Sequence, residues 1–439
     1  MCTDEAFSAL NFAKQSLVRL ISYYPIPNNH IFYNLLNHFW CNFFTNSFVS
    51  GRVLSIVFYC LLICGNFFLF YHFTKNNFIS FLCCLLLSLQ FIVWGFGHQG
   101  RGYALCHLLQ WIGFVSFYYY FFSNRNSKPE ALGVLIFCNI IGMWTVPVYL
   151  YFIVFQVFSA TIICLFRRKL FFQFWMALLL SGTGVFLVYL PAFCYSGIES
   201  LLGGGYNTGK SLSEIGKISW GYFYDLVTLQ TFNFLNPLKP LALVFFILPF
   251  ILIIFFRNLF ASFSKFVLLY GLIWISMVFM VLIMRQFPVF RGMGFQMHFS
   301  LLVLLLIAGH CIVRIQKRWI KPVQIFLAGL TLFLCVRMMN FNKEMSPTVL
   351  YGQDTRAFLN GLESLPQDFK PDATVWLSDE SFMWPFVLKD LKNVENYDCN
   401  FNYQDIIFLS EDDKPLPEAV MQHYKERNRA AWFIIYERK

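Results

Sequence analysis

Residues 51–72 read GRVLSIVFYCLLICGNFFLFYH and carry one charged side chain, Arg52. A helix needs about 20 mostly apolar residues to cross the hydrocarbon core of a bilayer, so this stretch is long enough to span a membrane. Nine further apolar runs follow it, at about 78–95, 103–122, 131–147, 148–166, 170–193, 239–256, 265–284, 296–313 and 322–340. The pattern predicts an α-helical multi-pass membrane protein with about ten spans.

The composition agrees with this class and divides the chain into parts of opposite charge. Hydrophobic residues make up 58% of the chain and charged residues 13%, whereas soluble domains carry about 25% charge. Residues 341–439 hold 17 of the 23 acidic and 11 of the 33 basic residues, a net charge of −6, and residues 1–340 carry +16. We therefore predict an external catalytic segment at 1–50, a transmembrane domain at 51–340 and a soluble domain at 341–439.

The C-terminal domain alternates apolar runs with turn signals, as small α/β domains do. The predicted strands are Thr374–Ser378, Asp405–Leu409 and Trp432–Tyr436, and the predicted helices are Thr355–Leu362, Phe382–Leu391 and Pro417–Arg427.

Loop charges predict the orientation. Twelve Lys and Arg residues fall in five short connections, those after the first, third, fifth, seventh and ninth spans. By the positive-inside rule these connections face the cytoplasm. Residues 1–50, the loops at 96–102, 194–238 and 285–295, and the C-terminal domain then share the outer side. Basic residues confined to short membrane loops do not form a nucleic-acid surface.

The N-terminal segment concentrates rare polar groups. Residues 1–340 contain six acidic side chains, and Asp4 and Glu5 are adjacent. They are candidate catalytic carboxylates, because ionisable groups at a membrane are expensive and usually functional. The alternative is a helix N-terminus capped by Thr3. Amphipathic patterns at 6–22 and 30–45 predict two helices lying on the membrane surface.

Asn28, Asn29 and His30 follow a Pro-x-Pro turn in the same segment. They are candidates for binding sugar hydroxyls or for orienting the carboxylates. The alternative is a turn that caps the second surface helix. A metal site shared by His30 and His38 is a weaker hypothesis, since no third ligand of a suitable type lies between them.

External basic residues are candidates for binding an anion. Arg101 and Tyr103 belong to the connection Gly97–Tyr103, and Arg291 lies in the loop 285–295. An arginine can bind a phosphate in a bidentate manner, although snorkelling to lipid headgroups is the alternative. Residues 204–211 match the P-loop expression, but they follow a membrane span and not a strand, so we reject a nucleotide site. Lys210 of this loop remains a candidate contact for an anionic substrate.

These stretches, taken in order, resemble the C-type glycosyltransferase superfamily, in the branch of protein O-mannosyltransferases and bacterial aminoarabinose transferases. The matching motifs cover most of residues 3–340: Asp4-Glu5, Pro25–His30 with Tyr33–Leu36, Ser50–Ser55, Gly100–Tyr103 and Phe287–Arg291. Two features depart from the family pattern. Pro-Asn-Asn-His replaces a His-Pro-Pro-like stretch, and members carry a transmembrane helix before the acidic motif, so we expect that this sequence lacks the first span.

The resemblance implies an inverting transferase. Asp4 would be the general base that deprotonates an acceptor hydroxyl, with Glu5 beside it. The donor would be a sugar on a polyprenyl phosphate, whose apolar tail lies between spans, and Arg101 and Arg291 would bind the leaving phosphate. The resemblance implies no metal and no cofactor, and it implies a bacterial inner membrane with the active site on the periplasmic side. It does not identify the acceptor.

Two other classes stay open from the residues alone. A transporter or flippase of lipid-linked saccharides would also need many spans, although no span carries an acidic residue for ion coupling. A non-catalytic assembly subunit would use the acidic C-terminal domain to recruit a partner.

Overall fold

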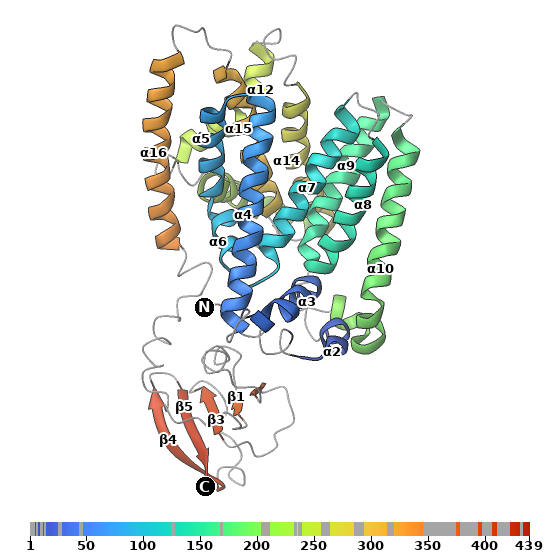
Figure 1. The fold of residues 1–439 in the computed structure, drawn as a ribbon, viewed down its shortest axis with the longest axis vertical. Coiled ribbons are helices and arrows are strands. Elements are labelled where there is room, and N and C mark those ends of the chain that lie inside the picture. The colour runs from blue at the N-terminus through green and yellow to red at the C-terminus, as the bar shows by residue number, and fades with distance from the viewer. Residues whose placement is uncertain are drawn as a thin grey trace.

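The computed structural model is mainly helical, with a small sheet at the C-terminal end of the chain (Figure 1). The structure describes residues 5, 8, 12, 15–24, 29–43, 47–123, 128–166, 170–202, 211–231, 235, 239–255, 264–284, 294–313, 320–345, 375–377, 394–396, 406–410, 422–430 and 433–439.

Two short helices, α2 (Leu17–Ser22) and α3 (Ile31–Trp40), precede the helical body. They lie within the predicted helices 6–22 and 30–45, but α2 begins only at Leu17, because the Ser16 side chain caps it there by accepting from the N–H of Arg19. The helices that follow are α4 (Ser47–Thr74), α5 (Asn77–Ser88), α6 (Phe91–Gly97), α7 (Tyr103–Phe122), α8 (Lys128–Thr145), α9 (Leu150–Phe166), α10 (Phe171–Leu202), α11 (Leu212–Asp225), α12 (Lys239–Phe255), α14 (Ser264–Met284), α15 (Gly294–Val313) and α16 (Ile320–Met345).

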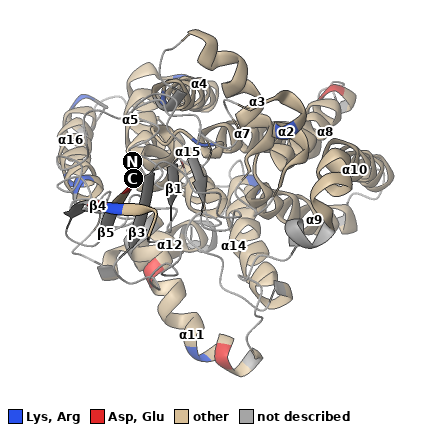
Figure 2. Ribbon diagram, turned by 90° about the horizontal axis from the view of Figure 1, so that it is seen from below, with Lys and Arg blue, Asp and Glu red and all other residues tan. Residues whose placement is uncertain are grey.

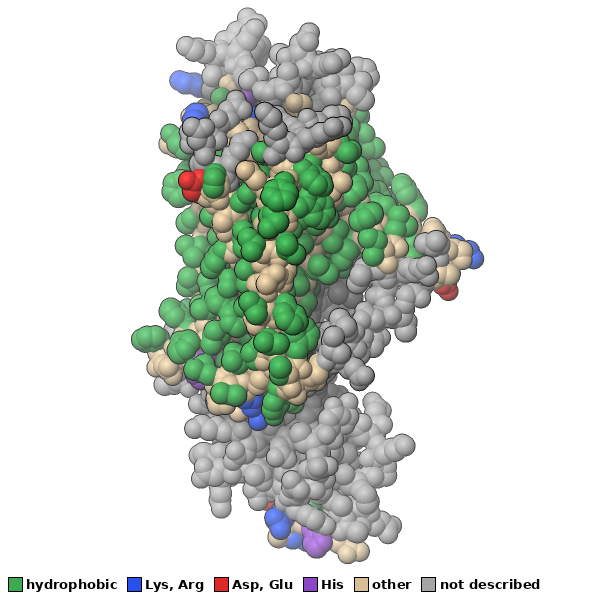
Figure 3. Space-filling model, turned by 90° about the vertical axis from the view of Figure 1, so that its right-hand side faces the viewer, with side chains coloured by type: hydrophobic (Ala, Val, Ile, Leu, Met, Phe, Trp, Pro, Cys, Tyr) green, Lys and Arg blue, Asp and Glu red, His purple; other side chains and the backbone are tan. Residues whose placement is uncertain are grey.

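Helices cover all ten predicted stretches, but the count of about ten spans is not confirmed. Among the described residues, six helices are long and apolar enough to cross a membrane, and a seventh span results if α5 and α6 are taken together. These two helices are bent by 74° relative to each other, while α8 and α12 have shorter apolar segments. Figure 3 shows the apolar side chains as a broad band between the two ends of the molecule. Figure 2 shows few charged residues on the described helices.

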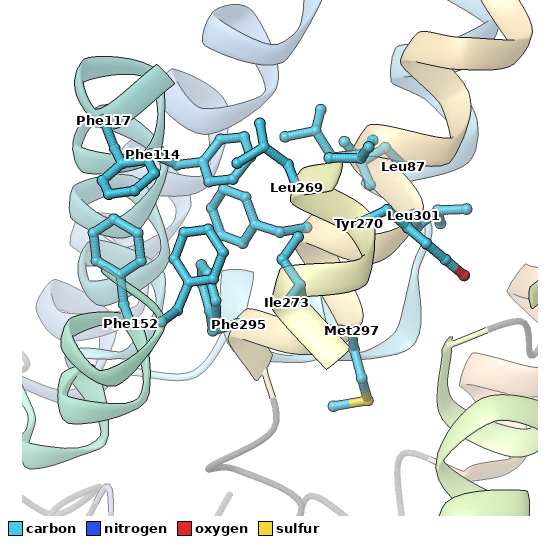
Figure 4. Close-up of a cluster of buried hydrophobic side chains, with 14 of the residues drawn as sticks. Leu87, Phe114, Phe117, Phe152, Leu269, Tyr270, Ile273, Phe295, Met297 and Leu301 are labelled. Carbon is cyan, nitrogen blue, oxygen red and sulfur yellow. The ribbon is translucent and has the colours of Figure 1, made fainter. Parts of the chain in front are cut away.

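The core combines aliphatic and aromatic side chains from several helices (Figure 4), and aromatic pairs join α7, α9 and α15 within it. Phe295 of α15 lies 5.0 Å from Phe152 and 5.1 Å from Phe155 of α9, between ring centroids. Phe299 of α15 lies 4.8 Å from Phe114 of α7. Tilted aromatic pairs of this kind contribute about 0.5–1.5 kcal/mol each beyond their buried area. Helix α15 is therefore the centre of the helical packing.

A buried amide pair joins α8 to α9. Asn139 and Gln156 exchange two hydrogen bonds, with nitrogen-to-oxygen distances of 3.0 and 2.8 Å. Ser181 of α10 lies 3.5 Å from the Asn139 amide nitrogen and closes the network. Polar contacts of this kind hold helices together in lipid, where apolar burial alone gives no preference for a protein partner.

The C-terminal sheet has five strands in the order β2-β1-β3-β5-β4. Their bounds are β1 Val375–Leu377, β2 Val394–Asn396, β3 Ile406–Ser410, β4 Tyr424–Ala430 and β5 Phe433–Arg438. Strand β1 is parallel to β2 and β3, and β5 is antiparallel to β3 and β4. In Figure 1 the sheet lies at the end of the molecule that carries α2 and α3.

The three predicted strands are confirmed as β1, β3 and β5. The predicted helix Pro417–Arg427 is wrong over its described part, because residues 424–427 belong to β4. Pairing with β5 decides this, and Lys425 forms a 3.4 Å ion pair with Glu437 across the two strands. The predicted helices 355–362 and 382–391 lie outside the described residues.

Candidate functional site

The turn 98–102 joins α6 to α7 and is held by side chains from three other parts of the chain. The N–H of Gly100 donates to the Glu5 carboxylate, and the N–H of Gly102 donates to His30 Nδ1 at 2.9 Å. The carbonyl of Arg101 accepts from Ser55 Oγ of α4 at 3.2 Å. The N-terminal segment, α3 and α4 therefore meet at one short turn.

Glu5 is 1% exposed and both of its carboxylate oxygens have donors. Oε2 accepts from Arg52 Nη2 at 2.9 Å, and Oε1 accepts from Arg52 Nε at 3.3 Å and from the Gly100 N–H. A two-point contact between a guanidinium and a carboxylate is both strong and directional. The carboxylate thus positions the turn against the first turns of α4.

Small residues let the turn approach α4 closely. A Cβ on Gly51 would lie 3.5 Å from Gly100 Cα and 3.4 Å from Asn37 Nδ2. The Tyr33 hydroxyl donates to the Gly51 carbonyl and lies 2.8 Å from Ser55 Oγ. A Cβ on Gly51 would be in ordinary van der Waals contact with Gly100, so the backbones of α4 and the turn pack directly against each other.

His30 and Arg101 are both 2% exposed and face each other. Arg101 Nη2 lies 3.0 Å from His30 Nε2. Tyr103 supports both groups: its ring meets the His30 ring edge to face at 4.9 Å, and Arg101 Cζ lies 5.3 Å from its centroid. A guanidinium over an aromatic face is attracted by the ring quadrupole. The site therefore holds a buried cation on an aromatic support.

Asn29 serves the local fold of this region. Its amide nitrogen donates to the carbonyls of Leu20 and Tyr23 at 3.1 and 3.0 Å, and its Oδ1 accepts from Asn34 Nδ2 at 2.9 Å. These bonds fasten α2 to α3. They favour the structural interpretation of Asn29 that the sequence left open.

His98 adds a titratable group beside the ion pair. Its Nδ1 lies 2.9 Å from the Trp94 carbonyl. Burial lowers the pKa of His98 below its ordinary value, and the Arg52 charge acts in the same direction, while the backbone bond to Trp94 and the Glu5 charge oppose them. The ring is therefore neutral at physiological pH.

The structure brings together four of the predicted site residues, namely Glu5, His30, Arg101 and Tyr103. Asp4, Asn28, Lys210 and Arg291 lie outside the described residues. Next to Lys210, Ser211 caps α11 in a capping box with Glu214. Within the described part of the chain, no group of three His, Cys, Asp or Glu residues is arranged to hold a metal ion.

Sequence analysis assigned no role in this site to Arg52, Tyr33 or Ser55, although the stretches Tyr33–Leu36 and Ser50–Ser55 belong to the motifs that carry the family resemblance. Arg52 did carry a signal, because it is a lone base at the outer end of the first span, where the positive-inside rule leaves few bases. The motifs that contain Tyr33 and Ser55 do not show what these two residues contact, because their role depends on the close approach of Gly51 and Gly100.

An apolar groove of about 480 Å³ runs between α8, α9 and α10. It is lined by Met143 of α8, by Leu150, Ile153 and Val157 of α9, and by one face of α10 between Trp175 and Val185. Met143 is two residues from Thr145, whose methyl carbon would lie 2.9 Å from a Cβ on Gly102. One lining residue of the groove, Met143, is thus two positions along α8 from a residue that contacts the turn 98–102.

Comparisons with known proteins bear on the fold. No protein-family model matches the sequence, and no curated protein matches it. Two solved structures of ArnT from Cupriavidus metallidurans are similar. The apo structure has a TM-score of 0.61 at 10% identity, covering 98% of this chain and 92% of ArnT. The structure of ArnT bound to undecaprenyl phosphate has a TM-score of 0.54 at 11% identity, covering 99% and 93%. Over nearly the whole length of both chains, this protein has the fold of ArnT.

Proposed function

We propose that the protein is an integral-membrane glycosyltransferase that moves a sugar from a polyprenyl phosphate to an acceptor hydroxyl on the outer face of the membrane. One observation carries the proposal: the acidic N-terminal segment and the buried Arg101 meet at the turn 98–102. This occurs in a chain with the fold of ArnT, a protein whose solved structures include a complex with undecaprenyl phosphate.

The proposed chemistry requires a base on one side of the sugar and a cation on the other. The acceptor oxygen gives its proton to the Asp4 carboxylate and attacks the anomeric carbon. The bond between that carbon and the phosphate oxygen breaks, and the phosphate leaves with the electron pair. Arg101 stabilises the growing charge by charge-assisted hydrogen bonds. Attack opposite the leaving group inverts the anomeric configuration, as in inverting glycoside chemistry.

Asp4 and Glu5 have different roles in this proposal. The oxygens of Glu5 already accept from Arg52 and Gly100, so a proton arriving there would compete with an ion pair. A general base needs a lone pair free to receive a proton. We therefore assign the base to Asp4, and we assign to Glu5 the positioning of the turn that carries Arg101.

The groove between α8, α9 and α10 suits the polyprenyl chain. Its lining is almost wholly apolar, and Met143 of the lining is two positions along α8 from Thr145, which contacts Gly102 of the turn. Binding an isoprenoid tail there removes apolar surface from lipid and solvent while the phosphate stays at the interface. Arg291 and Lys210, both on outer loops of the predicted topology, complete the proposal as additional cations for the phosphate.

Transfer is tested in proteoliposomes that contain the purified protein, a panel of undecaprenyl-phosphate sugars and an extracted pool of candidate lipid, protein and polysaccharide acceptors. Mass spectrometry follows the release of free undecaprenyl phosphate. We expect release by the wild type and loss of at least about 100-fold in Asp4→Asn, the range that general-base catalysis supplies. Glu130→Gln, which removes an exposed carboxylate in the first turn of α8, is the matched control. Equal rates in wild type and Asp4→Asn would contradict the proposed mechanism.

A further inference from the structure

The groove between α8, α9 and α10 has a definite length. Its lining on α10 extends from Trp175 to Val185. At about 1.5 Å per residue this segment spans about 15 Å along the helix axis, half of a hydrocarbon core of about 30 Å. Leu179 of the lining is 63% exposed, so the groove opens on the outside of the helical body. A lipid chain can therefore enter it sideways, over a depth of about one leaflet.

One end of the groove is tied through α8 to the turn between α6 and α7. The Tyr189 hydroxyl of α10, one helical turn beyond Val185, donates to the Met143 carbonyl of α8 at 2.8 Å. Thr145 follows about 3 Å further along the α8 axis. Its methyl carbon would lie 2.9 Å from a Cβ on Gly102 of the turn. The Val185 end of the lining is therefore the end nearer the turn.

Length and volume give the same number of isoprene units. An isoprene unit adds four carbon–carbon bonds, about 5 Å, to an extended chain, so a length of about 15 Å holds about three units. A carbon atom with its hydrogens fills roughly the share of one water molecule in the liquid, about 27 Å³, so the groove volume of about 480 Å³ corresponds to about 18 carbon atoms. The groove thus matches three to four units, far fewer than the eleven of an undecaprenyl chain.

We propose that the groove binds the three or four isoprene units next to the phosphate of the donor, and that the rest of the chain lies in the bilayer. Lipid chains are as apolar as the lining, so a tail that moves from the bilayer into the groove gains packing contacts and little else. Units that do not touch the lining add nothing to the affinity. This inference rests on the proposed function and adds to it a minimum chain length for the donor.

Binding is measured in nanodiscs with prenyl phosphates of two, three, four and eleven isoprene units, matched in double-bond geometry. Each is compared with its free alcohol at the same mole fraction in the lipid. We expect the affinity to rise about tenfold from two to four units, through the added packing contacts, and by less than about twofold from four to eleven. A steady rise up to eleven units, or equal affinity for all four phosphates, overturns the inference.

Two substitutions in the lining should move this limit in opposite directions. Gly182 lies about 4.5 Å along α10 from Val185, and nothing lies within 4 Å of its Cβ. Gly182→Phe should therefore block the groove beyond the first unit, so that the affinity no longer rises after two units. Trp175→Ala removes the ring at the far end and should extend the rise to about five units, because the indole fills about the volume of one unit. Gly133→Phe, outside the lining, should leave the limit at three to four units.

Thermal unfolding shows which variants are folded, and the outcomes then separate this inference from the proposed function. An unchanged limit in folded Gly182→Phe and Trp175→Ala overturns the inference alone, provided that the wild type binds undecaprenyl phosphate. Displacement of undecaprenyl phosphate by an equal mole fraction of phosphatidylglycerol shows that the groove holds ordinary lipid chains, and this also overturns the inference. Failure of the wild type to bind any prenyl phosphate overturns the proposed function as well.

Discussion

The carboxylate of Glu5 and the guanidinium of Arg52, 47 positions apart in the chain, form an ion pair with a 2.9 Å distance between Oε2 and Nη2. The same carboxylate accepts from the N–H of Gly100. The pair therefore joins the N-terminal segment, the start of α4 and the turn that carries Arg101. The candidate site is assembled by long-range contacts around this turn.

Breaking the ion pair should weaken the fold of the site. Arg52→Met leaves the Glu5 carboxylate, which is 1% exposed, without its charged partner. We expect the free energy of unfolding to fall by about 1–3 kcal/mol, the usual cost of losing one partner of a buried charged bond. Glu5→Gln should cost less, because its amide oxygen still accepts from Gly100. Thermal unfolding in detergent measures both, and the reverse order would contradict the assigned role of Arg52.

Gly102 has no room for a side chain. A Cβ there would lie 2.9 Å from Thr145 Cγ2 and 3.0 Å from His30 Nδ1. We expect Gly102→Ala to lower stability by about 1–3 kcal/mol, as overpacking does. Gly133→Ala in α8 is the control, since nothing lies within 4 Å of its Cβ. Similar unfolding temperatures for the two variants would show that the turn can shift.

Titration of His98 should make the folding stability depend on pH. Burial lowers the pKa of His98 in the folded protein below the unfolded value of 6.5. Between these two values the unfolded chain binds more protons, so folding stability rises with pH in this window and is full above pH 6.5. On acidification the wild type should lose more stability than His98→Gln, which does not titrate. Parallel stability curves from about pH 4.5 to about pH 7, an interval that contains the ordinary histidine pKa, would refute this expectation.

A large side chain at Gly182 should fill the groove between α8, α9 and α10 without changing the turn 98–102. Gly182 lines it, and nothing lies within 4 Å of a Cβ at this position. We expect Gly182→Phe to weaken undecaprenyl phosphate binding by about tenfold, the loss of one or two well-packed apolar groups. Binding of a short alkyl phosphate should not change. Gly133→Phe, equally open but outside the groove lining, is the control, and equal effects of the two substitutions would argue against a tail site here.

Sequence analysis located the helices well because length and apolar character are local signals. The ten predicted stretches all carry helices, and even the bent pair α5 and α6 falls within a single predicted run. The number of spans was harder to predict. It depends on whether α5 and α6, which meet at the polar Gln90, count as one span, and on whether the shorter apolar segments of α8 and α12 cross the membrane. Strand pairing in the C-terminal domain is non-local, which explains why residues 424–427 were predicted as helix.

The site could be predicted in part. Glu5 and Arg101 were identified because charged residues are rare in a membrane chain. His30 was identified because it belongs to the polar cluster of residues 28–30. The partners of these residues were not predictable, because Glu5 meets Arg52 and His30 meets Gly102 across 47 and 72 positions of chain. Asn29 shows the opposite error. Its motif suggested a binding residue, but its amide nitrogen donates to the carbonyls of Leu20 and Tyr23 and so stabilises the local fold.

The central claim is that the turn 98–102 receives the phosphate of a polyprenyl donor. The most direct measurement is an electron cryo-microscopy structure of the protein in nanodiscs with undecaprenyl phosphate. We predict phosphate density within about 3 Å of the Arg101 guanidinium, with the lipid chain entering the groove of α8, α9 and α10. Density for the phosphate at the opposite face of the bilayer, or away from Arg101, would contradict the account.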